Sequence, residues 1–116
     1  MKTESSHKEE TVLKGIPASP GIASGKAALI TKDSDYRRLA KGSVVVTVMT
    51  RPELVVGMDS IAGIVTDIGG SLCHAAIVAR EMGLPCVVGT GNATQVIKDK
   101  TLVCVDGSGG TVRRLR

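Results

Sequence analysis

The sequence predicts an α/β fold, because two kinds of segment alternate along it. The runs SVVVTVM (43–49) and IAGIVT (61–66) are continuous, apolar and rich in β-branched residues, which is typical of strands buried on both faces. Segments with helix signals lie between such runs. The chain has 116 residues, 42% of them hydrophobic, which is enough for one compact domain. With one Tyr, no Phe and no Trp, the core must be built from aliphatic side chains.

The first thirty residues predict a disordered lead-in followed by two strands. Residues 1–12, which include His7, are polar without apolar periodicity, so we expect them to be disordered and the domain to occupy residues 13–116. The segment GIPASPGIASGKAALI (15–30) has Gly and Pro punctuation and ends in an apolar run, which predicts a hairpin. From the polar beginning of the chain and its end soon after the last strand we expect a naturally short protein, while an excised domain stays open as the alternative.

The middle of the chain predicts short helical segments between the buried strands. DSDYRRLAKG (33–42) favours a helical turn, and Pro52 is suited to the first position of a short helix over 52–59. After the second buried strand and two glycines, we expect a helix from Leu72 to Met82. Its end is marked by three successive residues that suit a left-handed cap, a hydrophobic cap contact and a stop: Gly83, Leu84 and Pro85.

The last third predicts a return to β structure. CVVG (86–89) reads as a short buried strand, and ATQVI (93–97) as a helical turn. TLVCVDG (101–107) and TVRRL (111–115) predict two strands separated by a glycine-rich turn. Both ends of the domain are therefore β, with helices alternating with strands between them.

Composition excludes several classes of function. The formal charge is +4 and the pI about 9.2, but the charges are scattered and the densest cluster is Arg113, Arg114 and Arg116. Binding of single-stranded nucleic acid also needs aromatic stacking platforms, which Tyr36 alone cannot provide. No apolar run approaches the roughly 18 residues of a membrane span, and the N-terminus is not a secretory signal. We therefore expect a cytoplasmic protein that binds neither nucleic acid nor a membrane.

The cysteines indicate no metal site. Cys73, Cys86 and Cys104 are too few and too widely spaced for zinc ligands, and no second ligand lies close to Cys73 and its neighbour His74. An odd number of cysteines without a secretory signal favours reduced thiols. Cys86 and Cys104 lie within apolar runs, so we expect them to be small buried hydrophobic residues.

The candidate site is the segment in which a buried strand ends, Gly69 and Gly70 turn the chain, and a helix begins with His74 in its first turn. The first turn of a helix offers unpaired amide groups and the positive end of the dipole, which together favour a bound phosphate. The same field favours neutral imidazole, the nucleophilic form of histidine. A phosphoryl group carried on His74 would in turn be stabilised there.

From the residues alone, simpler interpretations stay open. Two glycines before a helix can be ordinary turn chemistry, and a single histidine can be solvated or a local cap. Ser71 could be the helix N-cap, and Cys73 either a reactive thiol or a packing residue. Thr50 and Arg51 end a buried strand and could flank the site. Arg80 could reach a phosphate or pair with a nearby carboxylate.

The segment GGSLCHAAIVAREMGLPCVVG (69–89) resembles the phosphohistidine segment of PEP-utilising enzymes, a family that includes phosphoenolpyruvate synthase, pyruvate phosphate dikinase and Enzyme I. GIPASPGIASGKAALI resembles the opening of that domain, and VVGTGNAT (87–94) and VCVDGSGGTV (103–112) resemble its end. The resemblance extends from Gly15 to about Val112. A motif of this length, in register with its flanking matches, is specific.

The resemblance implies a swivelling three-layer β/β/α phosphohistidine domain. His74 would be phosphorylated and would carry the phosphoryl group between an ATP-grasp nucleotide site and a PEP/pyruvate site on partner domains or subunits. Mg²⁺ is expected on those partners, and no cofactor on this chain, which would be inactive alone. The expected phosphate environment consists of Gly69, Gly70, Ser71, Cys73, Thr50 and Arg51.

One residue departs from the family pattern. The dikinase branch has a regulatory threonine two residues before the histidine, where this chain has Leu72. Regulation through that threonine is therefore not expected. Leucine at this position resembles the pattern of the antibiotic-phosphorylating and other PEP-synthase-like branches, so a different phosphoryl acceptor stays open. A scaffold module in which His74 is unused also stays open.

Overall fold

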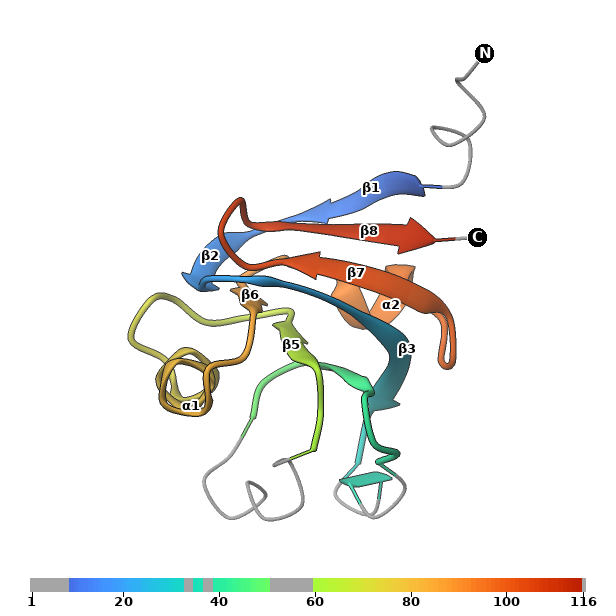
Figure 1. Ribbon diagram of the computed structural model, residues 1–116, viewed down its shortest axis with the longest axis horizontal. Helices are drawn as coiled ribbons and strands as arrows, with labels where there is room; N and C mark the ends of the chain where they lie inside the picture. Colours follow the sequence, from blue (N-terminus) through green and yellow to red (C-terminus); the bar gives the residue numbers. More distant parts are fainter. Residues whose placement is uncertain (1–8, 33–34, 37–38, 51–59, 116) are drawn as a thin grey trace.

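Eight strands form a single sheet in the order β1-β8-β7-β3-β4-β5-β6-β2. The computed structural model describes residues 9–32, 35–36, 39–50 and 60–115 (Figure 1). The strands are β1 (Glu9–Lys14), β2 (Ile16–Ser19), β3 (Ile22–Ile30), β4 (Val44–Thr47), β5 (Gly63–Thr66), β6 (Cys86–Val88), β7 (Leu102–Asp106) and β8 (Thr111–Leu115). The helices are α1 (His74–Met82) and α2 (Ala93–Val96).

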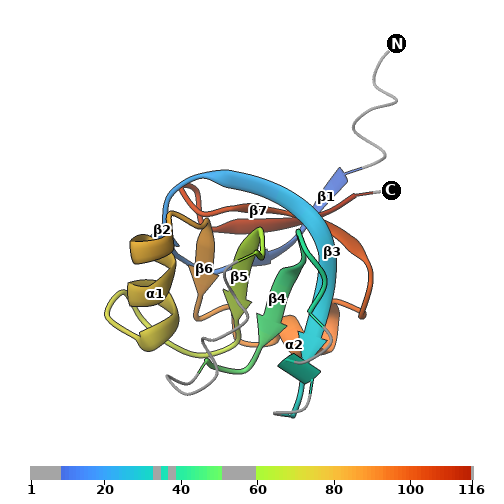
Figure 2. The ribbon, with the colours of Figure 1, turned by 60° about the horizontal axis from the view of Figure 1, so that its bottom comes forward.

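The sheet is folded over along β3, which belongs to both of its halves. Residues 22–26 of β3 pair with β7 in antiparallel fashion, whereas residues 27–30 pair with β4 in parallel. The first half, β1-β8-β7-β3, is antiparallel. In the second half β3, β4, β5 and β6 run parallel, and β2 is an antiparallel edge strand. Figures 1 and 2 show the two halves facing each other, with α1 outside the second half.

The central strands alternate their side chains between two cores. Val44 and Val46 of β4 lie between the halves of the sheet, packed with Val103 and Val105 of β7, whereas Val45 points to the opposite side, toward α1. Both sides of β4 are fully buried, which accounts for its continuous apolar run. Together with α1, the two halves form three layers, β/β/α, which confirms the predicted fold class.

Helix α1 packs closely on the second half of the sheet through small side chains. Ala75, Ala76 and Ala79 are buried in the core that also contains Val45. The helix ends at Gly83, whose φ of 71° is left-handed, and Leu84 N–H donates to the Ala79 carbonyl at 2.9 Å. The helix end predicted from the sequence is therefore confirmed.

The structure corrects two predictions for the first thirty residues. Residues 9–12, expected to be disordered, belong to β1, which pairs along β8. Residues 15–30 form two strands, as predicted, but β2 pairs with β6 while β3 pairs with β7 and β4, so they are not a hairpin. The chain passes from one edge of the sheet to the other between Lys14 and Ile16.

Of two predicted helical segments, the structure describes one in part and the other not at all. Asp35 and Tyr36 form a short 3₁₀ turn within the segment predicted to be a helical turn. The helix predicted over 52–59 lies outside the described residues. In the described ranges no helix is long and apolar enough to cross a membrane.

Candidate functional site

His74 is the first residue of α1 and follows the loop of residues 67–73 that leaves β5. The N-cap is Cys73, which makes no side-chain capping hydrogen bond, and the first turn contains no acidic residue. The helix thus begins two residues later than predicted, and Ser71 is not its cap. Because neither a side-chain cap nor a carboxylate serves this helix end, its amide groups and positive dipole are available to an anion.

Thr50 fixes one side of the His74 ring. Its Oγ1 lies 2.8 Å from Nδ1 of His74, and Thr50 itself is only 7% exposed. The residue lies just beyond β4, next to β5 in the sheet, so the parallel order brings the two segments to the same edge. Thr50 therefore contacts the ring through Nδ1 and not through Nε2. Arg51, the other residue expected from this strand end, lies outside the described residues.

A small pocket of about 120 Å³ lies beside the imidazole. Most of its wall is apolar, and its hydroxyl groups come from two threonines. The lining residues are Met49, Thr50, Thr66, Ile68, Gly69, Cys73, His74 and Ala75. Apart from His74 itself, none of these described lining residues is a lysine, an arginine or a histidine, and Arg51, which follows Thr50, is not among the described residues.

The two glycines of the loop are not equivalent. Gly69 has a φ of +124°, which L side chains rarely adopt, and a Cβ built there would lie 2.8 Å from Sγ of Cys73. A Cβ on Gly70 would meet nothing within 4 Å. Gly69 is therefore required by the turn that presents His74, whereas Gly70 is not restricted by its surroundings.

Asp67 fixes the beginning of the loop. Its carboxylate accepts hydrogen bonds from the backbone N–H and the hydroxyl of Thr94, at 2.9 and 2.6 Å. Its own N–H donates to the Thr47 carbonyl at 3.0 Å. The contact with Thr94 was not predicted from the sequence. The feature that could have indicated it is the position of an aspartate directly after a buried strand.

Arg80 fixes the end of the same loop. Its Nε donates to the Ala18 carbonyl at 2.8 Å, and its terminal Nη2 donates to the Ser71 carbonyl. The guanidinium thus binds backbone carbonyl groups rather than the carboxylate considered from the sequence. Ser71 was expected in the phosphate environment, and the contact that the structure gives it is this hydrogen bond from Arg80 to its backbone carbonyl.

The thiols behave as packing groups. The structure has all three cysteines free, with Cys86 and Cys104 buried as predicted. Burial raises the pKa of Cys86 to about 12, and the nearby Cys73 adds to the effect. Cys73 is partly buried against the core beneath α1. In the described ranges no three His, Cys, Asp or Glu side chains form a group that could hold a metal ion.

Exposed apolar side chains are frequent in the segments that follow the carboxyl ends of β4 and β5 and in α1, which begins with His74. Five of the eight large hydrophobic residues that are exposed in the described part of the chain follow β4, follow β5 or belong to α1 and its preceding loop. We call this set the apolar rim: Val48, Met49, Ile68, Leu72 and Ile77. Leu72 is 82% exposed, the highest value in the set. Such a surface is typical of a contact with another protein surface.

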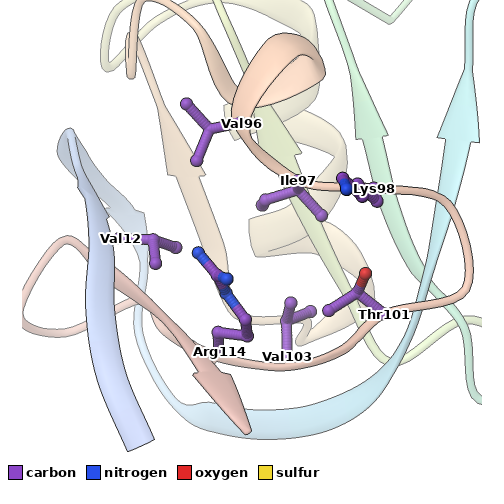
Figure 3. A pocket seen from close by; sticks show the side chains of 7 residues that line it. All are labelled: Val12, Val96, Ile97, Lys98, Thr101, Val103 and Arg114. Atoms are coloured by element: carbon purple, nitrogen blue, oxygen red, sulfur yellow. The ribbon is translucent and has the colours of Figure 1, made fainter.

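A second pocket, of about 100 Å³, lies elsewhere in the molecule (Figure 3). It is formed by β1, β7, β8 and the segment at α2, and the Arg114 side chain extends into it. Its lining residues are Val12, Val96, Ile97, Lys98, Thr101, Val103 and Arg114. Arg114 Nη2 lies 3.8 Å from a carboxylate oxygen of Glu10. The two pockets share no residue, so this one is not part of the site at His74.

Comparison with known proteins identifies a matching family and relatives that are similar over most of the chain. The sequence profile of the family described as "PEP-utilising enzyme, mobile domain" matches residues 39–110. A probable phosphoenolpyruvate synthase of Methanothermobacter thermautotrophicus is 50% identical over 89% of this chain, and the phosphoenolpyruvate synthase of Aeropyrum pernix is 52% identical over 89%. The chain spans only 15% and 13% of the length of these two relatives.

A solved structure shares the fold. The solution structure of an Enzyme I protein (nEIt) superimposes with a TM-score of 0.59 at 38% sequence identity, covering 66% of this chain and 32% of that one. The resemblance noted in the sequence therefore extends to the three-dimensional arrangement.

Proposed function

Because the chain belongs to the family of the PEP-utilising enzyme mobile domain, we propose that it is a phosphoryl carrier in which His74 is transiently phosphorylated. It would take the group from one partner site and deliver it to another. The proposed partners are an ATP-grasp nucleotide site and a PEP/pyruvate site, on other domains or subunits. The observation that carries the proposal is the 2.8 Å contact between Thr50 Oγ1 and Nδ1 of His74 at an uncapped helix N-terminus.

The contact with Thr50 suggests which nitrogen reacts. In the proposed step Nδ1 carries the ring proton and donates it to Thr50 Oγ1, which leaves the lone pair on Nε2. That lone pair attacks the phosphorus of the donor, an N–P bond forms, and the P–O bond to the leaving group breaks with its electron pair on oxygen. The proton on Nδ1 is retained throughout. Dividing the transfer into two such steps is covalent catalysis.

The charge of the carried group must be stabilised largely by the partners. The N-terminus of α1 contributes about 0.3 to 2 kcal/mol toward a bound anion. Among the described residues that line the pocket beside His74, none is a lysine or an arginine, and Arg51 lies outside the described part of the chain. Phosphoryl transfer generally depends on metal ions and basic groups around the transferred phosphate, so we propose that Mg²⁺ and these groups belong to the partner sites.

We propose that the apolar rim docks against both partner sites. Two of its five side chains, Ile68 and Leu72, belong to the loop that presents His74, and Leu72 has the largest exposed fraction of the set. Burial of such side chains would hold the imidazole over the partner's phosphoryl group while water is excluded. Each partner should then offer an apolar border around a cationic centre.

Intact-mass spectrometry tests the carrier function directly. The chain and a His74→Ala variant are incubated with host extract and either ATP or PEP at mildly alkaline pH. We expect one added phosphoryl group in the native chain, lost in acid and absent from the variant. No labelling from either donor would contradict the carrier function and favour a scaffold role. Labelling that is not discharged by pyruvate would favour a different acceptor, as the resemblance at Leu72 allows.

A further inference from the structure

A single side chain, that of Arg80, ties two distant segments to each other beside His74. Nε donates to the carbonyl of Ala18 in β2, and Nη2 donates to the carbonyl of Ser71 in the loop before α1. Arg80 lies six residues after His74 in the helix, while Ser71 lies three residues before it. The loop must therefore fold back along the helix, and one guanidinium holds it there against the sheet.

The loop depends on this contact because its second half has few other attachments. Its first half is held by Asp67 and by Ile68 N–H, which donates to the Val48 carbonyl at 3.1 Å. In residues 70–72 the Ser71 carbonyl is bound by Arg80, which supplies the one side-chain hydrogen bond to this stretch within the described residues. The helix start that follows has no side-chain cap. Without Arg80, the hydrogen bond that closes residues 70–73 would be the backbone one, in which Cys73 N–H donates to the Gly70 carbonyl at 3.1 Å, and no side chain of the described residues would hold this stretch.

Arginine is suited to this position for chemical reasons. Its guanidinium presents several donors in a rigid plane, so two carbonyl groups on different segments can be bound at once. It also stays charged at every pH of interest, so the contact does not titrate. Lysine carries its donors on one nitrogen at the end of a flexible chain and is a poorer match for two fixed acceptors.

We propose that Arg80 is a positioning residue for phosphorylation of His74. By holding the Ser71 carbonyl, it keeps His74 at the first position of α1, with Nδ1 on Thr50 Oγ1 and Nε2 as the nitrogen that reacts. This inference rests on the proposed function, since it explains how that histidine is oriented. Displacement of a reacting group by about 1 Å can cost up to 100-fold in rate, so loss of the contact is expected to lower reactivity by about tenfold.

The test uses phosphoramidate, a small donor that needs no partner protein. Nε2 of His74 attacks its phosphorus, the P–N bond breaks, and ammonia leaves. The chain contains one other histidine, His7, which serves as an internal reference for the reagent. Peptide mapping gives the ratio of the His74 rate to the His7 rate in the native chain and in Arg80→Met, Arg80→Lys and Arg114→Met. The last variant is a matched control, because Arg114 lines the second pocket.

We expect Arg80→Met to lower the rate ratio by about tenfold, Arg80→Lys to be intermediate, and Arg114→Met to match the native chain. Amide exchange in Arg80→Met should accelerate at residues 71–74 and stay unchanged in β7. An unchanged ratio would overturn the proposal. So would a lower ratio with equally accelerated exchange in β7, since that indicates loss of overall stability. Failure of the carrier function would instead appear as no labelling from ATP or PEP while the phosphoramidate result still holds.

Discussion

Oγ1 of Thr50 and Nδ1 of His74 lie 2.8 Å apart, which links the end of β4 to the start of α1 through one hydrogen bond. The two residues are 24 positions apart in the sequence. The parallel pairing of β4 with β5 brings both segments to the same edge of the sheet. A largely buried hydroxyl can therefore select the tautomer of a more exposed imidazole.

Replacing Thr50 by Val should slow phosphorylation of His74. The substitution removes the hydrogen-bonding hydroxyl, which is worth about 1 kcal/mol, so the rate with phosphoramidate should fall about fivefold. Nitrogen-15 NMR of the ring should show a smaller fraction of the tautomer protonated on Nδ1. Thr50→Ser keeps the hydroxyl and serves as the control. Equal rates in the Val and Ser variants would show that the hydroxyl does not select the reactive tautomer.

Replacing Leu72 by Ala should weaken docking and leave the chemistry intact. Leu72 is 82% exposed, so the free energy of unfolding should change by less than about 0.5 kcal/mol. With a purified partner we expect KM for this chain to rise several-fold at unchanged kcat, and the phosphoramidate rate to stay the same. Leu102→Ala, an exposed leucine on β7, is the control. A loss of transfer as complete as in His74→Ala would rule out a role limited to docking.

Alanine should be tolerated at Gly70 and costly at Gly69. The left-handed backbone and the 2.8 Å approach to Cys73 Sγ predict that Gly69→Ala lowers the free energy of unfolding by about 1 to 3 kcal/mol. Gly70→Ala meets open space and should change it by less than about 0.5 kcal/mol. Urea unfolding of both variants measures the difference. Similar costs at the two positions would contradict the backbone geometry described for this loop.

Stability should decline above pH 9 because of Cys86. Burial raises the pKa of its thiol from 9.0 to about 12, so between these values the folded chain keeps a proton that the unfolded chain releases. The contribution is therefore complete below pH 9 and is lost as the pH rises toward 12. At pH 10.5 the loss should reach about 2 kcal/mol. Urea unfolding at pH 8 and 10.5 should show this loss in the native chain and in Cys104→Ala, and a smaller loss in Cys86→Ala, where the remaining effect comes from Tyr36, whose pKa burial also raises.

The parts of the fold that sequence could predict depend on local signals. The end of α1 follows from three adjacent residues, and the buried strands follow from uninterrupted apolar runs. The pairing of β2 with β6 rather than β3 could not be predicted this way, because it depends on partners about 70 residues away. The formation of strand β1 could not be predicted for the same reason. Its charged residues carry no strand periodicity, and β8 provides the partner that makes it a strand.

The candidate site shows the same division. The two glycines and His74 form one continuous segment, so the sequence pointed to them together. Thr50 was expected near the site from its place at a strand end, but its contact with Nδ1 depends on which strands are neighbours. Ser71 was predicted as the N-cap on spacing alone. In the structure Cys73 occupies that position, and the Ser71 carbonyl accepts a hydrogen bond from Arg80, a contact nine residues away that spacing does not reveal.

The antiparallel register of β1 on β8 places Glu9 directly opposite Leu115, so β1 begins at the same end of the ladder at which β8 ends (Figure 1). A mechanical pull on these two residues would load the hydrogen-bonded pairs one after another, as in opening a zipper, rather than all at once in shear. The strands should then separate at low force, beginning with Glu9 and Leu115. Tension from either end would peel away β1 before it reached the loop that carries His74, so that loop is shielded from strain along the chain.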